Sequence, residues 1–380
     1  MKRALENHPR LAADSARIVA AKGLATQAGL RPNPRLTIQS ENWTFKGAPN
    51  QPIASTFTDQ FLYASQLIET AGKRQRRVDL AETGVRVAVE DREVAARQVA
   101  SRVKLAYWQA VGAQRVADLL RGNQQNLLQT VRFHEIQLKE GQIPEADLVR
   151  VRLEHDRASV MLESALRESE AARVALQREM GERTFPEIRL TGSLEAPVVP
   201  LSIDVEMALS ARPDVQRARR AVEQSQANLR LQQAAARPDV EVLAGYKRTA
   251  GYDTLLWGVQ MGLPFTNRNQ GNIAAGSAGL RAAQADAAAI EAEVRAEVAA
   301  AQRDVEARRE RIAGRLSASR AAAAESVDIA RAAYREGGTD LLRLLDAERV
   351  YIELEVWNAR MLTEYRQSLV TLETALGVAP

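Results

Sequence analysis

The chain has 380 residues, of which 46% are hydrophobic, 26% charged and only 4% aromatic, a composition typical of long helices. A formal net charge of +4 gives little support to nucleic-acid binding, and the absence of cysteine excludes disulfides, thiol catalysis and cysteine metal sites. Lys2 and Arg3 resemble the start of a signal peptide, but no apolar run follows them. We therefore expect either a soluble protein or an exported one whose signal peptide is not in this chain.

The sequence repeats itself over most of its length. Four pairs of residues keep a nearly fixed separation: Pro9 with Pro213 and Pro34 with Pro238 are 204 residues apart, and Gly141 with Gly337 and Gly181 with Gly377 are 196 apart. One length difference of eight residues explains the change in separation. We predict two copies of one unit, 1–182 and 203–380, joined by a linker at 183–202.

The first copy combines helical and extended patterns. Its predicted elements are a helix at 3–31, a β-hairpin at 35–68, a long helix at 71–140 and a helix at 144–181. Pro32 ends the first helix, and Gly141 breaks the long helical pattern, which contains no proline. A helix of about 70 residues is roughly 105 Å long, which is longer than the core of an ordinary domain.

The second copy follows the same order. Its predicted elements are a helix at 203–236, a β-hairpin at 239–264, a long helix at 272–336 and a helix at 340–376. The predicted fold is therefore mainly α with a β part: a duplicated helix–strand–strand–helix unit in which long helices pack as antiparallel coiled coils. The glycines at the two bends allow the chain to reverse sharply.

The predicted strands have one apolar face. Hydrophobic side chains alternate with small or polar ones, and we place six on the apolar face: Trp257, Val259, Met261, Leu263, Phe61 and Tyr63. This period fits a lipid-facing barrel strand, and it also fits a small sheet packed on helices. Nine of the chain's 17 aromatic residues lie in the windows 34–68 and 238–265, which contain the two β-hairpins, as in the aromatic belts of membrane barrels.

Four strands in one chain are too few to close a barrel. An open sheet edge in lipid leaves backbone groups unpaired, at a cost of several kcal/mol each. If these strands span a membrane, several chains must therefore share one barrel. Three chains would supply twelve strands, which is enough for a water-filled pore, and their helices would form a helical barrel.

The chain resembles the TolC family of outer-membrane efflux channels, in particular the outer-membrane partners of heavy-metal and drug efflux pumps. The resemblance covers essentially the whole chain and rests on the duplicated unit and on the segments NPRLTI, RPDVEV, VQMGLPFTNRNQG, YREGGTDLLRLLDAERVY and LVTLETALG. It implies a homotrimer with a β-barrel in the outer membrane and an α-barrel in the periplasm. It also implies two protein partners, a periplasmic adaptor and an inner-membrane pump.

The resemblance assigns roles to the two bends. In the family the bend end narrows to close the channel, and adaptors dock there. The gate candidates are Asp346, Arg343, Asp147 and Thr339, and the adaptor-docking candidates are Gly141, Gln142, Gly337 and Gly338. Arg343 stands where the family often has an acid, and Thr339 stands where it has the arginine that pairs with the position of Asp147. The alternative for Asp346 is an ordinary exposed charge on a helix.

Other motifs predict little further chemistry. The basic run Lys73–Arg77 has no interleaved aromatics, which favours a solvated face or lipid headgroups over nucleic acid. The three histidines lack metal-site spacing, and we find no catalytic pairing, so we expect no metal, no cofactor and no enzyme. The alternative to a channel is a coiled-coil scaffold outside the membrane. The sequence does not name the exported substrate.

Overall fold

The computed structural model describes residues 1–42, 58–195, 203–249 and 251–378. The predicted loop of the first β-hairpin, 43–57, and the end of the predicted linker, 196–202, lie outside the described residues. The chain divides into two compact units, and each combines segments from both predicted copies. The division into two sequence copies therefore stays a prediction, because the compact units follow a different partition.

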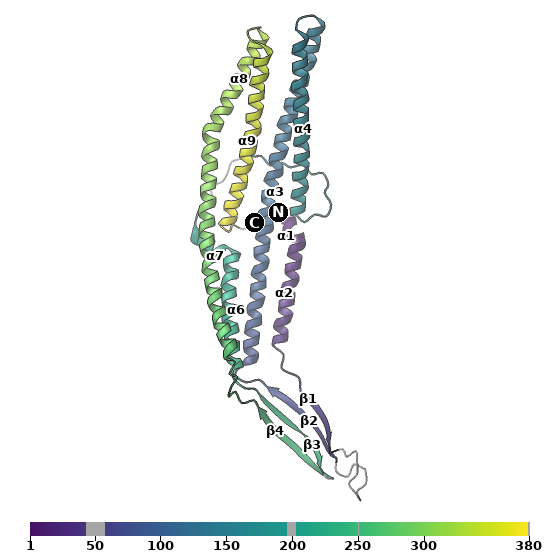
Figure 1. Cartoon of the computed structure of the whole chain (residues 1–380), viewed down its shortest axis with the longest axis vertical. Helices are drawn as coiled ribbons and strands as arrows, with labels where there is room; N and C mark the ends of the chain where they lie inside the picture. Colours follow the sequence, from purple (N-terminus) through teal and green to yellow (C-terminus); the bar gives the residue numbers. More distant parts are fainter. Residues whose placement is uncertain (43–57, 196–202, 250, 379–380) are drawn as a thin grey trace. The chain divides into compact units, whose positions relative to one another are not determined.

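The first unit is helical and consists of Met1–Ala13, Arg92–Pro213 and Glu291–Pro380. Its helices are α1 (Lys2–Asn7), most of α3 (Lys73–Lys139), α4 (Glu145–Glu179), α5 (Val205–Ala211), the end of α7 (Gln270–Arg311), a π-helical turn η1 (Ile312–Leu316), α8 (Ser317–Arg335) and α9 (Leu341–Ala375). We call α3 with α4 the first helical hairpin and α8 with α9 the second helical hairpin (Figure 1).

Both helical hairpins turn through the same backbone motif. Gly141 and Gly337 have φ values of +70° and +73°, in the left-handed region that glycine adopts without a steric penalty. The Gly141 N–H donates to the Leu138 carbonyl, and the Gln142 N–H donates to the Gln137 carbonyl. This pair of bonds is the Schellman motif, which gives partners to carbonyls at the end of a helix.

The linker is part of the core of the first unit. Leu194 is 6% exposed and packs with Val111 and Ala359 of α3 and α9. The Arg366 guanidinium donates to the Leu194 carbonyl at 3.0 Å and lies over the Trp108 ring. The described part of the linker, 183–195, therefore crosses the helices as a packed segment and is not a free tether.

The second unit consists of Asp14–Asp91 and Asp214–Ile290 and contains the sheet. It includes most of α2 (Pro9–Ala28) and α6 (Pro213–Ala235), the beginnings of α3 and α7, and the strands β1 (Arg35–Glu41), β2 (Asp59–Ile68), β3 (Val240–Thr249) and β4 (Tyr252–Met261). The sheet is antiparallel with the order β1-β2-β3-β4 (Figure 1). The two β-hairpins thus pair with each other through β2 and β3. A mainly helical fold with a four-stranded antiparallel part confirms the predicted fold class.

Polar contacts fix the base of the sheet to the start of α3. Asp239, just before β3, accepts hydrogen bonds from the Thr70 N–H at 2.9 Å and from Lys73 Nζ at 2.8 Å. Arg77 of the basic run pairs with Glu69. The first and last residues of that run are therefore engaged within the second unit, and they hold the strand ends on the helix.

The helices predicted at 3–31 and 203–236 are each interrupted near their start. His8 and Arg212 have ψ values of 125° and 123°, so they are extended and separate α1 from α2 and α5 from α6. Each precedes a proline, and the proline ring disfavours the helical conformation of the residue before it. The prediction of unbroken helices was wrong at these two positions.

The helix predicted at 272–336 is also not uniform. It contains the π-helical turn η1, which separates α7 from α8. The Ser317 hydroxyl donates to the Ala313 carbonyl at 3.0 Å and gives that carbonyl a side-chain partner. Within the described part of the chain, no helix combines the length and the apolar character needed to cross a membrane.

Candidate functional site

One face of the sheet in the second unit is apolar and exposed. Residues paired directly across antiparallel strands share a face, and the register pairs Tyr246 with Leu255, Ala244 with Trp257 and Val242 with Val259. The exposed fractions are 88% for Leu255, 80% for Trp257 and 65% for Val259. Nothing in the described residues covers these three side chains, so this face needs an apolar environment from outside the chain.

The register corrects the predicted apolar face in three places. Phe61 pairs with Lys247, and Tyr63 pairs with Gly245, which places both aromatics on the face opposite Trp257. Lys247 Nζ lies 5.0 Å from the centre of the Phe61 ring, on the same face. β4 ends at Met261, so Leu263 lies beyond the strand and belongs to neither face.

The opposite face of the sheet is mainly polar. Its members include Arg35, Thr37, Gln39, Glu241, Lys247, Thr254 and Gln260, together with Phe61 and Tyr63. The two outer strands, β1 and β4, each have one neighbour in the sheet. Each therefore presents a row of backbone groups that can pair with another strand. The sheet thus has an apolar face, a polar face and two open edges.

The two helical hairpins meet through a buried histidine near their bends. His134 of α3 is 1% exposed, and its Nε2 lies 2.9 Å from the Tyr334 hydroxyl of α8. Its Nδ1 lies 2.8 Å from the Thr130 carbonyl. Because a carbonyl only accepts, Nδ1 donates to Thr130, and in the neutral ring Nε2 then accepts a hydrogen bond from the Tyr334 hydroxyl. Burial raises the pKa of Tyr334, and the nearby charge of Asp147 raises that pKa further.

Sequence reasoning missed this contact. His134 and Tyr334 are 200 residues apart, so no local pattern connects them. One signal was available: in a chain with few aromatics, Tyr334 stands three residues before a bend glycine. Asp147, a gate candidate in the first turn of α4, lies near this contact, and its charge raises the pKa of Tyr334.

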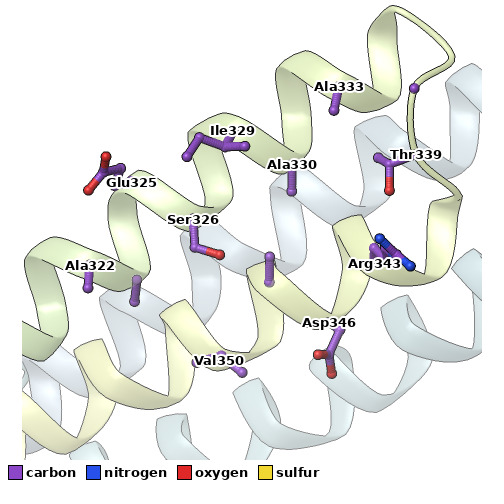
Figure 2. A pocket seen from close by; sticks show the side chains of 13 residues that line it. Ala322, Glu325, Ser326, Ile329, Ala330, Ala333, Thr339, Arg343, Asp346 and Val350 are labelled. Carbon is purple, nitrogen blue, oxygen red and sulfur yellow. The ribbon is translucent and has the colours of Figure 1, made fainter.

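The other three gate candidates lie together in a groove of the second helical hairpin. The groove is about 630 Å³ in volume and runs between α8 and α9. Figure 2 shows Thr339, Arg343 and Asp346 on one wall, and Glu325 and Ile329 on the other. The structure thus brings three of the four gate candidates together within one chain, and it places Asp147 elsewhere.

The charge of Asp346 is partly balanced by a neighbour. Its carboxylate accepts a hydrogen bond from Arg349, one turn further along α9. This hydrogen bond and the carboxylate charge raise the pKa of Arg349. Both side chains are about half exposed, at 56% and 42%, so water screens the pair and its free energy is small. Asp346 is therefore not an isolated negative charge.

The docking candidates Gly141, Gln142, Gly337 and Gly338 are all exposed at the bends. Gly338 also lines the groove, and its N–H donates to the Ala333 carbonyl at 2.8 Å. Among the described residues, no group of three or more His, Cys, Asp or Glu side chains is arranged to hold a metal ion. The bends thus expose the four docking candidates, of which three are glycines.

The model of the outer membrane efflux protein family matches residues 1–182 and 205–378. The chain belongs to the outer membrane efflux protein family. The match leaves out 183–204, nearly the same segment as the predicted linker. The resemblance predicted from the sequence is confirmed, and the chain is a transport channel protein of the outer membrane and not an enzyme.

Solved channel structures share the fold. The chain is similar to CusC with 20% identity and a TM-score of 0.82, over 100% of this chain and 91% of that one. The open state of MtrE from Neisseria gonorrhoeae gives 18% identity and a TM-score of 0.80, over 99% and 87% of the two chains. VceC from Vibrio cholerae gives 20% and 0.78, over 99% and 94%. Among curated proteins, no sequence matches significantly.

Proposed function

We propose that the chain is the exit duct of a tripartite efflux system. Substrate passes by gated diffusion through a pore that several copies share, and an inner-membrane pump supplies the energy. The sheet lies in the outer membrane, and the helices extend into the periplasm. The exported substrate is a small molecule or a metal ion, which the pump and the adaptor select.

The observation that carries this proposal is the two-faced sheet with open edges. Leu255, Trp257 and Val259 expose a continuous apolar surface, while Gln260 and Lys247 lie on the other face. Lipid on one side and water on the other would satisfy both faces. In lipid, the backbone groups of β1 and β4 must find partners, because no water is present to pair with them.

A homotrimer would give partners to the backbone groups at both edges of the sheet. β1 and β4 are antiparallel in the four-stranded order, so β4 of one copy can pair with β1 of the next in the same alternating pattern. Three copies give a closed barrel of twelve strands, which leaves room for an aqueous pore. Closure removes every sheet edge, and the polar face then lines the pore.

The bends are the adaptor and gate end of the duct in this proposal. The exposed bend residues Gly141, Gln142, Gly337 and Gly338 suit docking of a periplasmic adaptor. Asp346 and Arg343 lie close to the second bend, where a narrow pore would bring copies of each together. Their charges would then set the ion preference of the closed end.

Two neighbouring residues of β4 test the assignment of the faces. Val259→Arg places a charge on the apolar face and should reduce the fraction of assembled channel, because arginine at mid-bilayer costs about 2–4 kcal/mol. Gln260→Arg is the matched control with the same new side chain on the polar face. It should assemble normally and alter single-channel conductance in planar bilayers. Equal assembly of both variants would contradict the proposed faces.

The alternative of a coiled-coil scaffold outside the membrane makes a different prediction. A duct with an exposed apolar barrel should aggregate when detergent is removed, and it should be trimeric in detergent by native mass spectrometry. A scaffold should stay monodisperse in detergent-free buffer. A detergent-independent monomer would contradict the proposed function.

A further inference from the structure

Positive charge is concentrated where the sheet joins the helices of the second unit. We call the segments 29–34, 69–79, 236–239 and 262–269 the base of the sheet, because they connect strands to helices or begin α3. They contain seven basic residues and three acidic ones. This excess of four equals the formal net charge of the whole chain, which is +4, so the rest of the chain is neutral overall.

Three of these basic residues already have acidic partners. The pairs are Lys73 with Asp239 at 2.8 Å, Arg76 with Asp79 at 3.4 Å, and Arg77 with Glu69. The other four, which we call the base arginines, are exposed: Arg31, Arg74, Arg237 and Arg268. None of the four has a carboxylate partner among the residues that the structure describes. Their charge therefore remains to attract an anion from outside the chain.

Hydrogen bonds hold two of the base arginines at the end of α2. Arg74 Nε donates to the carbonyl of Gly29, which directly follows α2 and lies two residues before Arg31. This bond uses only Nε, and the two terminal nitrogens of Arg74 have no partner within the described ranges. Arg74 is thus oriented by the backbone while its terminal nitrogens are left for a ligand.

The other two base arginines are tied to the same end of the unit. Asp239, two residues after Arg237, pairs with the first residue of α3, next to Arg74. The side chain of Asn269, next to Arg268, donates to the Gln232 carbonyl of α6 at 2.8 Å. The loop after β4 is therefore attached to the helix that leads into Arg237.

This loop, residues 262–269, exposes large apolar side chains although polar contacts fix its shape. The Asn269 N–H donates to Asn267 Oδ1 at 3.0 Å, and Arg268 Nε donates to the Pro264 carbonyl at 3.3 Å. Leu263 and Phe265 are nevertheless 61% and 76% exposed. Apolar and aromatic side chains beside a guanidinium are the combination found where membrane proteins meet the headgroup layer.

The length of the strands places the base at the level of that layer. β2, β3 and β4 have ten residues each, a length of about 34 Å. At the tilt of about 35–45° found in membrane barrels they rise about 24–28 Å, which matches the apolar band of about 25 Å. Residues just beyond the strand ends then lie where hydrocarbon gives way to headgroups. The base adjoins the helices, so it faces the periplasmic leaflet.

We propose that the base of the sheet binds the phosphate groups of anionic phospholipids in the periplasmic leaflet. The base arginines donate to the phosphate oxygens, while Leu263 and Phe265 enter the adjoining acyl chains. This inference rests on the proposed function, because the sheet must lie in a membrane. The contacts would fix the height of the duct in the bilayer, since moving the chain along the membrane normal separates the arginines from the headgroups.

Lipid selectivity tests the charged contacts. Phosphatidylglycerol and phosphatidylcholine with the same acyl chains are titrated separately into the detergent-solubilised channel, and bound lipid is counted by native mass spectrometry. The parent should prefer phosphatidylglycerol. Arg74→Gln with Arg268→Gln should weaken that binding about fivefold for each arginine at low ionic strength, and leave phosphatidylcholine unaffected. Arg74→Lys with Arg268→Lys should retain most of the preference, because the charge remains.

The matched control removes two arginines from the same unit, Arg230→Gln with Arg281→Gln. These lie within α6 and α7, five and eleven residues from the helix ends nearest the sheet. The control should keep the preference for phosphatidylglycerol. No preference in the parent, or an equal loss in the control, would overturn the proposed contacts. Inorganic phosphate at the same concentration should not displace the lipid, and displacement would overturn the assignment to a lipid.

The depth of the loop gives an independent readout, which the absence of cysteine makes possible. Phe265→Cys carrying a fluorophore, in nanodiscs, should be quenched by lipids with a nitroxide on the headgroup. Val19→Cys is the control: it is 68% exposed in the parent, and it lies nine residues before the end of α2, about 14 Å along the helix. It should be quenched far less, and equal quenching at the two positions would overturn the placement of the loop.

The outcomes separate this inference from the proposed function. An assembled trimer in which Phe265→Cys cannot be labelled would show that a second copy covers the loop, and would overturn the lipid contact while leaving the duct intact. A trimer without lipid preference would do the same. A monomer that is stable without detergent would overturn both proposals.

Discussion

The bends of the two helical hairpins have the same backbone conformation, but the side chains behind them differ. Gly141 and Gly337 adopt nearly equal φ values, and the Schellman hydrogen bonds are the same at both bends. Behind the bends the surfaces diverge, with His134 on α3 where α8 has Ala330. His134 is enclosed by the other hairpin, whereas Ala330 lines an open groove.

This difference separates two kinds of constraint. The bend geometry depends on backbone conformation, which glycine supplies regardless of what lies nearby. The side chains behind the bend depend on what covers them. Where the two helical hairpins pack on each other, the buried side chain is His134, a large polar ring with two hydrogen-bond partners. A repeat can therefore keep its bend while the surface of one copy is buried within the chain and the equivalent surface of the other is an open groove.

The largest expected effect on stability comes from removing the contact between His134 and Tyr334, which joins the two helical hairpins. His134→Ala removes a fully buried ring and leaves the Tyr334 hydroxyl without its partner. The cavity and the unpaired hydroxyl should lower the free energy of unfolding by about 2–4 kcal/mol. Urea denaturation in detergent, followed by the helical circular dichroism signal, measures this loss.

The matched control is another histidine of the first helical hairpin. His155 is partly exposed, and its Nε2 lies 2.9 Å from Gln124 Nε2. His155→Ala should cost about 1 kcal/mol or less, because water can replace the lost hydrogen bond. If both substitutions destabilise the chain equally, the buried contact with Tyr334 is not the distinguishing feature of the first helical hairpin.

Much of the fold could be predicted from the sequence because the signals are local. Long proline-free helical patterns, period-2 strands and bend glycines each act within a few residues, so their positions agree with the structure to within a few residues. The interruptions at His8 and Arg212 also have a local cause, the proline that follows each of them. The helical periodicity on both sides obscured that signal.

The candidate sites were harder, because their geometry depends on pairing across the chain. Alternation divides each strand into two faces, but it does not say which face of β2 continues which face of β4. Phe61 and Tyr63 were misplaced for this reason, since only the register through β3 relates them to Trp257. The contact of His134 with Tyr334 likewise has no local sequence signature.

The next largest effect is the loss of stability when glycines at different helix ends are replaced by alanine. A Cβ added at Gly141 or Gly337 would have no atom within 4 Å, so replacement by alanine meets only the conformational penalty, about 1 kcal/mol. A Cβ at Gly181 would lie 3.0 Å from Pro9 and 3.2 Å from His8. Gly181→Ala should therefore cost more, about 2 kcal/mol.

Thermal unfolding in detergent distinguishes these glycine variants. The two bend variants should show the same shift, since they share one backbone motif and open surroundings. A larger loss for Gly337→Ala than for Gly141→Ala would mean that something covers the second bend in the assembled protein. The stability cost of substitution at Gly337 would then depend on assembly, and the two bends would not be equivalent in the assembled protein.

The smallest effect concerns the charges beside the second bend. Asp346→Ala should raise conductance and weaken block by multivalent cations without loss of trimer, because it removes a carboxylate from the proposed narrow end. Arg349 balances that carboxylate, so the change should be modest. Arg349→Ala should shift selectivity the opposite way, towards cations, by exposing the full charge of Asp346. Arg343→Ala should act in the same direction if Arg343 shares the pore. Planar-bilayer recordings in asymmetric salt compare all three variants, and unchanged selectivity and block in Asp346→Ala would make that residue an ordinary surface charge.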